Sequence, residues 1–180
     1  MYKSLLKCIL PVISLTAGFA YADEFKLTST DIAHGSFMSK AFEFNGFGCS
    51  GENKSPQLSW SGAPSGTQAY AIMAYDPDAP TGSGWWHWQV VNIPANVTSI
   101  ASSSSKINDK AVIDIANDYG IKGFSGACPP EGHGAHRYQF TVYALSKKLE
   151  LPANASGALT GYMVKANTLA SSTIEALYKR

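Results

Sequence analysis

The stretch GACPPEGHGAHRYQF, residues 126–140, joins a rigid turn, a flexible turn and the start of a strand. Pro129 and Pro130 fix φ and remove two backbone donors, so this part of the stretch should be extended and stiff. Gly132 and Gly134 then permit a tight return of the chain. We expect the stretch to form one wall of a pocket.

A strand is predicted from Ala135 to Leu145, directly after that turn. The side-chain period of two places His136, Tyr138 and Phe140 on one face of this strand. Arg137 then faces the other way, where we expect it to pair with an acidic residue below the pocket floor. On this stretch alone, a half-buried hairpin with a histidine and a tyrosine at its edge explains the pattern equally well.

A second polar cluster precedes a tryptophan-rich strand that is predicted from Trp85 to Pro94. The segment DPDAP holds Asp76 and Asp78 one residue apart around a proline, so the two carboxylates should point similarly. In the strand that follows, alternation places His87 on the same face as Gln89. A histidine among tryptophans is more often structural than functional, but this one follows a loop that carries two acids.

Many short strands separated by turns indicate an all-β fold, an antiparallel β-sandwich with short peripheral helices. The central strand should be Ala69–Tyr75, which is apolar on both faces. Shorter alternating segments at Phe25–Thr28, Ala41–Phe44 and Gln57–Trp60 are predicted to be strands as well. Helical spacing of apolar residues from Leu159 to Tyr178 predicts a C-terminal α-helix that packs on the sandwich.

The segment before Asp23 is organised like a secretory signal peptide. Lys3 and Lys7 accompany a short apolar run, and small residues up to Ala22 provide a cleavage pattern. The run is too short for an integral membrane span, and a retained N-terminal helix fits this order of residues less well. We therefore expect residues 1–22 to be cleaved, residues 23–180 to form one domain, and the product to be periplasmic or secreted.

The charge of the remaining chain argues against a nucleic-acid partner. Two of the 14 basic residues and none of the 13 acidic ones precede Asp23, so 12 basic and 13 acidic residues remain, a net charge of −1. Nucleic-acid binding normally needs clustered lysine and arginine, and here these residues are mostly scattered singly.

Cys49 and Cys128 are the two cysteines that would remain after cleavage. An oxidising compartment favours a disulfide between them. The bridge would close a loop of roughly 80 residues and stabilise the fold by about 4–5 kcal/mol on chain-entropy arguments. Two buried free thiols are the alternative, which we disfavour because both cysteines lie in glycine-rich loops and exposed thiols are a liability outside the cell.

Two segments of the chain resemble the signature segments of the phosphatidylethanolamine-binding protein family. They are DPDAP at 76–80 with WHW at 86–88, and PP at 129–130 six residues before HRY at 136–138. The loop CSGENKSP at residues 49–56 is more similar to the bacterial branch, the Raf kinase inhibitor-like proteins, in an exported form. The resemblance extends over nearly all of the chain from Asp23 onward.

The resemblance implies a Greek-key β-sandwich with a small pocket that binds phosphate or the head group of a phospholipid or phosphotyrosine, without a cofactor or a metal. Carried over position by position, the pocket residues are Asp76, Asp78, His87, Pro129, Pro130, His136 and Tyr138. Two imidazoles and a phenol can donate hydrogen bonds to phosphate oxygens. The two carboxylates should then orient the imidazoles and raise the histidine pKa, or accept from an ammonium group such as ethanolamine.

The sequence leaves other classes of function open. A hydrolase could use aspartate and histidine as acid and base, although Ser125 lacks the setting of a nucleophile elbow. A zinc site at His133, His136, His87 and Asp76 would need an unfamiliar ligand spacing. A third class is a regulator or inhibitor of a protease or a signalling protein, whose identity the sequence does not give. The oligomeric state, including a homodimer, is equally open.

Overall fold

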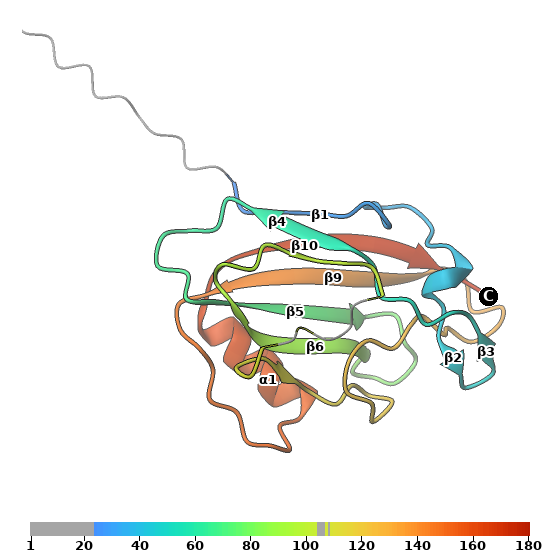
Figure 1. The fold of residues 1–180 in the computed structure, drawn as a ribbon. Helices are drawn as coiled ribbons and strands as arrows, with labels where there is room; N and C mark the ends of the chain where they lie inside the picture. Colours follow the sequence, from blue (N-terminus) through green and yellow to red (C-terminus); the bar gives the residue numbers. More distant parts are fainter. Residues whose placement is uncertain (1–23, 104–106, 108) are drawn as a thin grey trace, which may run out of the picture.

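The long strands of the molecule form one antiparallel sheet in the order β10, β9, β5, β6, β8 (Figure 1). Their bounds are β10 Thr168–Tyr178, β9 His136–Leu145, β5 Ala69–Asp76, β6 Trp85–Pro94 and β8 Ile113–Asp114. The central strand β5 is buried at seven of its eight positions, as its apolar sequence predicts. The computed structural model describes residues 24–103, 107 and 109–180, so the predicted signal peptide at residues 1–22 lies outside the described residues.

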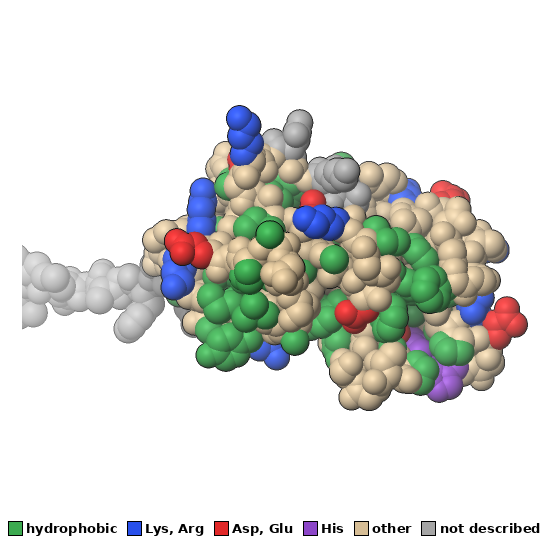
Figure 2. All heavy atoms as spheres, turned by 90° about the horizontal axis from the view of Figure 1, so that it is seen from below, with side chains coloured by type: hydrophobic (Ala, Val, Ile, Leu, Met, Phe, Trp, Pro, Cys, Tyr) green, Lys and Arg blue, Asp and Glu red, His purple; other side chains and the backbone are tan. Residues whose placement is uncertain are grey.

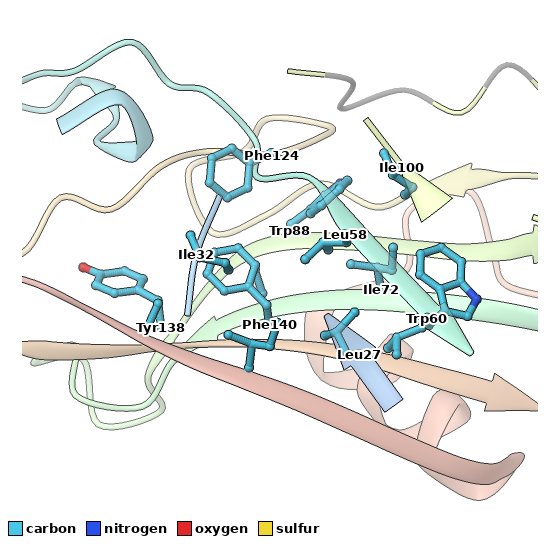
Figure 3. Close-up of a cluster of buried hydrophobic side chains, with 14 of the residues drawn as sticks. Leu27, Ile32, Leu58, Trp60, Ile72, Trp88, Ile100, Phe124, Tyr138 and Phe140 are labelled. Atoms are coloured by element: carbon cyan, nitrogen blue, oxygen red, sulfur yellow. The ribbon is translucent and has the colours of Figure 1, made fainter. Parts of the chain in front are cut away.

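A second, smaller antiparallel sheet lies across one face of the first. It consists of β1 Lys26–Thr28, β4 Leu58–Ser61 and β7 Ser99–Ile100, in the order β1, β4, β7. The main hydrophobic core fills the space between the two sheets (Figure 3). Its largest fully buried members include Trp88, Phe140, Leu58, Ile72 and Ile93. The predicted all-β sandwich is therefore confirmed.

One helix, α1 Gly157–Ala166, covers the opposite face of the five-stranded sheet (Figure 1). Ser156 caps the helix by accepting the backbone N–H of Leu159 on its side chain. A second apolar cluster lies between helix and sheet and includes Met73, Val91 and Val164. Within the part of the chain that the structure describes, no helix is long and apolar enough to cross a membrane.

The predicted helix over 159–178 is wrong in its second half. The helix ends at Ala166, and β10 pairs with β9 from Thr168, opposite Leu145, to Tyr178, opposite His136. The apolar residues of this segment also fit a period of two, since Ile174, Ala176 and Tyr178 are all buried. The β-branched Thr168, Thr173 and Ile174 favour a strand over a helix here, and the long ladder with β9 decides between the two periods.

Short elements close the end of the sandwich where the chain also ends (Figure 1). A hairpin of β2 Asn45–Gly46 and β3 Cys49–Ser50 lies there, after the 3-10 helix η1 Lys40–Phe42. The predicted strand at Ala41–Phe44 is therefore wrong. Its residues form the 3-10 turn and then one isolated bridge between Glu43 and Ala127.

Candidate functional site

Three strands of the large sheet bring polar residues to one end of the molecule. Asp76 is the last residue of β5, His136 is the first residue of β9, and His87 lies near the start of β6. Because these neighbouring strands are antiparallel, the end of β5 meets the beginnings of β6 and β9. Figure 2 shows histidine side chains at the surface of this end, beside hydrophobic ones.

A cavity of about 250 Å³ opens between these residues. Six of the seven predicted pocket residues border it, namely Asp76, His87, Pro129, Pro130, His136 and Tyr138. The remaining lining residues are Phe47, Ala79, Pro80, Thr81, Trp85, Tyr119, Cys128 and Arg180. The stretch at residues 126–140 and the polar cluster from Asp76 to His87 therefore enclose one space.

Asp78, the seventh predicted residue, does not border the cavity. Its carboxylate accepts hydrogen bonds from Nε and Nη2 of Arg137, at 2.9 and 2.7 Å, and from the backbone N–H of Arg137 at 2.9 Å. The Arg137 side chain holds the pKa of this carboxyl below its ordinary value. The predicted pairing of Arg137 with an acid is confirmed, and Asp78 is that acid.

Asp76 and His136 form a buried hydrogen bond at the floor of the cavity. Oδ2 of Asp76 accepts from Nδ1 of His136 at 2.7 Å, and both side chains are almost fully buried. Oδ1 of Asp76 accepts the backbone N–H of Asp78 at 2.8 Å. Because the carboxylate accepts at Nδ1, the proton of a neutral His136 lies on that nitrogen. The predicted orienting role of a carboxylate therefore applies to this one imidazole.

An irregularity in β6 turns His87 toward the cavity. Tyr75 pairs with Trp86 and Ala74 pairs with Trp88, so His87 is an additional residue that interrupts the alternation, a β-bulge. Gln89 instead points to the helix, where its Nε2 donates to the carbonyl of Gly157 at 3.1 Å. The predicted common face of His87 and Gln89 is therefore wrong.

A backbone carbonyl, and not a carboxylate, orients His87. Its Nδ1 lies 2.8 Å from the carbonyl oxygen of Ser125, which can only accept, so Nδ1 carries the proton. Burial lowers the pKa of His87 below its ordinary value of 6.5. The prediction that the neighbouring carboxylates raise the histidine pKa is wrong for this residue, because desolvation outweighs the attraction of Asp76. Neutral His87 then presents a lone pair at Nε2.

Tyr138 places a hydroxyl group in the cavity that forms no hydrogen bond of normal geometry with the described residues, although the Asp76 carboxylate and the backbone of Cys128 lie near it. The side chain is only 2% exposed. Figure 3 shows Tyr138 at the margin of the hydrophobic core, with its oxygen directed away from the other labelled side chains. Burial and the nearby Asp76 carboxylate raise the pKa of this phenol, so it stays protonated and can donate.

Pro129 and Pro130 form one wall of the cavity, the proline wall, which is held in place from two sides. Cys128, which precedes Pro129, forms a disulfide with Cys49, as predicted, and the two Cα atoms are 5.9 Å apart. Arg180 donates from Nε to the carbonyl of Pro129 at 2.8 Å and from Nη1 to the carbonyl of Gly48 at 2.9 Å. Its guanidinium also lies 3.7 Å from Glu131, so a cation is fixed beside the cavity.

Sequence reasoning missed Arg180 and an aromatic rim around the mouth of the cavity. Tyr119 lies at the centre of the rim, with ring centroids 5.1 Å from Phe47 and 5.1 Å from Trp85. Burial raises the pKa of Tyr119 to about 12. Phe47 is 74% exposed, which is unusual for so large an apolar side chain. Its exposure, and the meeting of aromatic side chains from three separate segments, are visible only in three dimensions.

The zinc alternative receives no support from the geometry. His133 and His136 are close, but among the residues described no group of three histidine, cysteine, aspartate or glutamate side chains is arranged to hold a metal ion. The two histidines are instead in direct contact, with Nδ1 of His133 2.7 Å from Nε2 of His136.

The fold and this pocket define a class of protein. The family model of the phosphatidylethanolamine-binding proteins matches residues 28–179, and the chain belongs to that family. The resemblance carried by DPDAP, WHW, PP and HRY is thereby confirmed.

Two similar relatives are proteins of Escherichia coli. The UPF0098 protein YbcL of Escherichia coli is 46% identical over 173 residues, which cover 93% of this chain and 94% of the relative. YbhB of the same organism is 42% identical over 157 residues, covering 85% and 99% of the two chains. The crystal structure of YbcL, described as a member of the mammalian PEBP family, superposes with a TM-score of 0.84 at 48% identity and covers 87% of this chain and 99% of that one.

Proposed function

We propose that the protein is an exported binding protein whose pocket takes the phosphoryl group of a small phosphorylated molecule or of a phospholipid head group. Membership of the family implies anion binding in general. The ligand-binding residues proposed are Asp76, His87, Pro129, Pro130, His136 and Tyr138, with Arg180 added from the geometry. Asp78 contributes by holding the loop that carries Asp76.

The observation that carries the proposal is the unpaired hydroxyl of Tyr138. A buried polar group without a well-formed hydrogen bond costs about 1–3 kcal/mol, so the presence of this hydroxyl in a cavity points to a ligand that accepts a hydrogen bond from it. A phosphoryl oxygen is such an acceptor. The guanidinium of Arg180, at the same cavity, supplies the positive charge that favours an anion over a neutral ligand.

The remaining groups suit a ligand that also carries a donor. Neutral His87 has a lone pair at Nε2, and the Asp76 carboxylate oxygens have further lone pairs that can accept. Either group can accept from the hydroxyl of a protonated phosphate or from the ammonium group of an ethanolamine ester. The volume of about 250 Å³ lies just below the usual range of drug-sized pockets and fits a head group better than a large ligand.

Export is the setting that explains the disulfide. The bond between Cys49 and Cys128 forms and persists in an oxidising compartment. This agrees with the signal-peptide pattern that precedes Asp23. We propose a periplasmic or secreted protein, in which the pocket meets ligands outside the cytoplasm.

Isothermal titration with inorganic phosphate and with O-phosphorylethanolamine, at pH 6 and pH 8, tests the binding function. We expect saturable binding by the wild-type protein and its loss in His136→Ala. His34→Ala serves as the matched control, because His34 is an exposed histidine outside the pocket. If the wild-type protein binds neither ligand at either pH, the pocket does not have this function.

A further inference from the structure

The loop between the proline wall and β9 carries an exposed histidine that the proposed binding function has not used. His133 stands between Gly132 and Gly134, whose φ angles are 73° and 93°. A Cβ atom added at either glycine would meet no other atom within 4 Å, so this part of the loop projects into open space. Despite its exposure, the imidazole of His133 reaches back to the buried His136.

The contact between the two imidazoles fills the remaining hydrogen-bonding position of His136. Asp76 accepts the proton at Nδ1, which leaves Nε2 as the only other polar atom of that ring. Nδ1 of His133 lies 2.7 Å from this Nε2. A hydrogen bond of this kind needs one proton between the two nitrogens. On a neutral His136 this Nε2 is the acceptor and Nδ1–H of His133 is the donor. An anion that is to receive a hydrogen bond from Nε2 must therefore displace His133, and His136 must at the same time take a second proton from solvent or from the ligand.

The two partners differ in how firmly they are held. His136 is 2% exposed and lies opposite Tyr178 in the β9–β10 ladder, so its ring has a fixed position. His133 is exposed, and its backbone N–H donates to the carbonyl of Pro130 at 3.2 Å. Rotation of the His133 side chain is enough to open the contact, because no strand has to move.

We propose that His133 is an internal competitor for the pocket: it occupies the ligand's hydrogen-bonding position on His136 in the empty protein and has to be displaced on binding. This inference rests on the proposed binding of a phosphoryl group. An anionic oxygen forms a charge-assisted hydrogen bond that is roughly twice as strong as one between neutral groups, so it displaces the imidazole more readily than a neutral carbonyl or hydroxyl does. His133 thereby lowers the measured affinity of every ligand that needs this position. Ligands with an anionic acceptor are the ones able to displace it.

Two substitutions at position 133 test whether its side chain competes with the ligand for Nε2 of His136. His133→Ala removes the competing imidazole, and we expect inorganic phosphate to bind about fivefold more tightly at neutral pH, the equivalent of one ordinary hydrogen bond. In His133→Asn the side-chain amide can replace Nδ1 and either donate or accept, so its affinity should stay within about twofold of the wild type. Titration calorimetry on the full-length protein measures all three affinities.

An equal or weaker affinity of His133→Ala for phosphate overturns the inference while the binding function stands. Absence of phosphate binding in all three proteins overturns both, so the two failures are distinguishable. A second measurement addresses the contact directly. In ¹⁵N spectra of the imidazoles, phosphate should shift the ring signals of His133 as well as those of His136, and phosphate binding that leaves His133 unshifted would also refute the competition.

Discussion

The carboxylate of Asp76 and the imidazole of His136 meet at 2.7 Å, and their side chains are 3% and 2% exposed. Asp76→Ala leaves two donors without an acceptor, the buried Nδ1–H of His136 and the partly buried backbone N–H of Asp78. We expect the free energy of unfolding to fall by about 1–3 kcal/mol. A double-mutant cycle with His136→Ala, measured by urea denaturation, should give a coupling of at least about 1 kcal/mol. Additive effects of the two substitutions would contradict the structural role of the pair.

Tyr138→Phe should change stability and binding in opposite directions. Removal of the unpaired hydroxyl eliminates the cost of a buried polar group, so we expect the empty protein to be as stable as the wild type or more stable. Phosphate loses one donor, and its affinity should fall about fivefold. Thermal denaturation and calorimetric titration measure the two effects. A marked loss of stability would show that the hydroxyl already has a partner within the empty protein.

Asp78→Asn tests whether the seventh predicted residue contacts the ligand. Its carboxylate faces Arg137 outside the cavity, so we expect the phosphate affinity to remain within about threefold of the wild type. His136→Gln provides the comparison and should lose at least tenfold, because a neutral amide replaces the imidazole on the cavity floor. If Asp78→Asn lost as much phosphate affinity as His136→Gln, Asp78 would have to be counted among the residues that contact the ligand.

The depressed pKa of His87 predicts a loss of stability in mild acid. The unfolded chain takes up a proton near pH 6.5 and the folded protein only at lower pH, so the unfolded state binds more protons between these two values. The contribution of His87 is therefore complete above pH 6.5 and declines as the pH falls toward the folded-state pKa. The slope is at most about 1.4 kcal/mol per pH unit.

Urea denaturation between pH 7 and pH 5 should show this slope in the wild-type protein, and His87→Gln should flatten it. The acids with lowered pKa values, Asp31, Glu43 and Asp78, contribute mainly below that range, because their ordinary values are 3.8 and 4.5. An unchanged slope in His87→Gln would assign the effect to another group.

Reduction of the disulfide should weaken the pocket before it unfolds the sandwich. Cys128 precedes the proline wall, and Cys49 belongs to the short hairpin on the other side of the bond. The loss of stability should approach the chain-entropy value of about 4–5 kcal/mol. We expect phosphate affinity to fall in reductant at a temperature where circular dichroism still shows the folded sheet. The double variant Cys49→Ser/Cys128→Ser should behave like the reduced protein. If its phosphate affinity equals that of the wild type, the disulfide does not hold the proline wall in its binding position.

The sequence predicted the parts of the fold that depend on neighbouring residues. The apolar run Ala69–Tyr75 marked the central strand, and alternation from His136 placed His136, Tyr138 and Phe140 on one buried face. The spacing of apolar residues did not predict the right element where the same residues fit two patterns. From Leu159 to Tyr178 the apolar residues fit a helix and a strand, and only the partner strand β9 decided between them.

Contacts between distant segments could not be predicted in the same way. Arg180 is a single basic residue with no local motif, and its bonds to Gly48 and Pro129 depend on the final packing of the chain. Tyr119 joins the rim of the cavity through the rings of Phe47, from the turn between β2 and β3, and of Trp85, the first residue of β6. The pKa of His87 depends on its complete burial, which the adjacent acids did not indicate.

The additional residue in β6, His87, lines the cavity and at the same time interrupts the pairing of β5 with β6. Deletion of His87 would let Trp86 and Trp88 follow one another opposite Tyr75 and Ala74, and the register could then run without a shift from Ile72 to Asp76. Such a protein would have a more regular sheet and one histidine fewer in its cavity. A single-residue insertion into β6 is therefore sufficient to add an imidazole to this cavity. The stability that the deletion variant gains would measure what that step costs the fold.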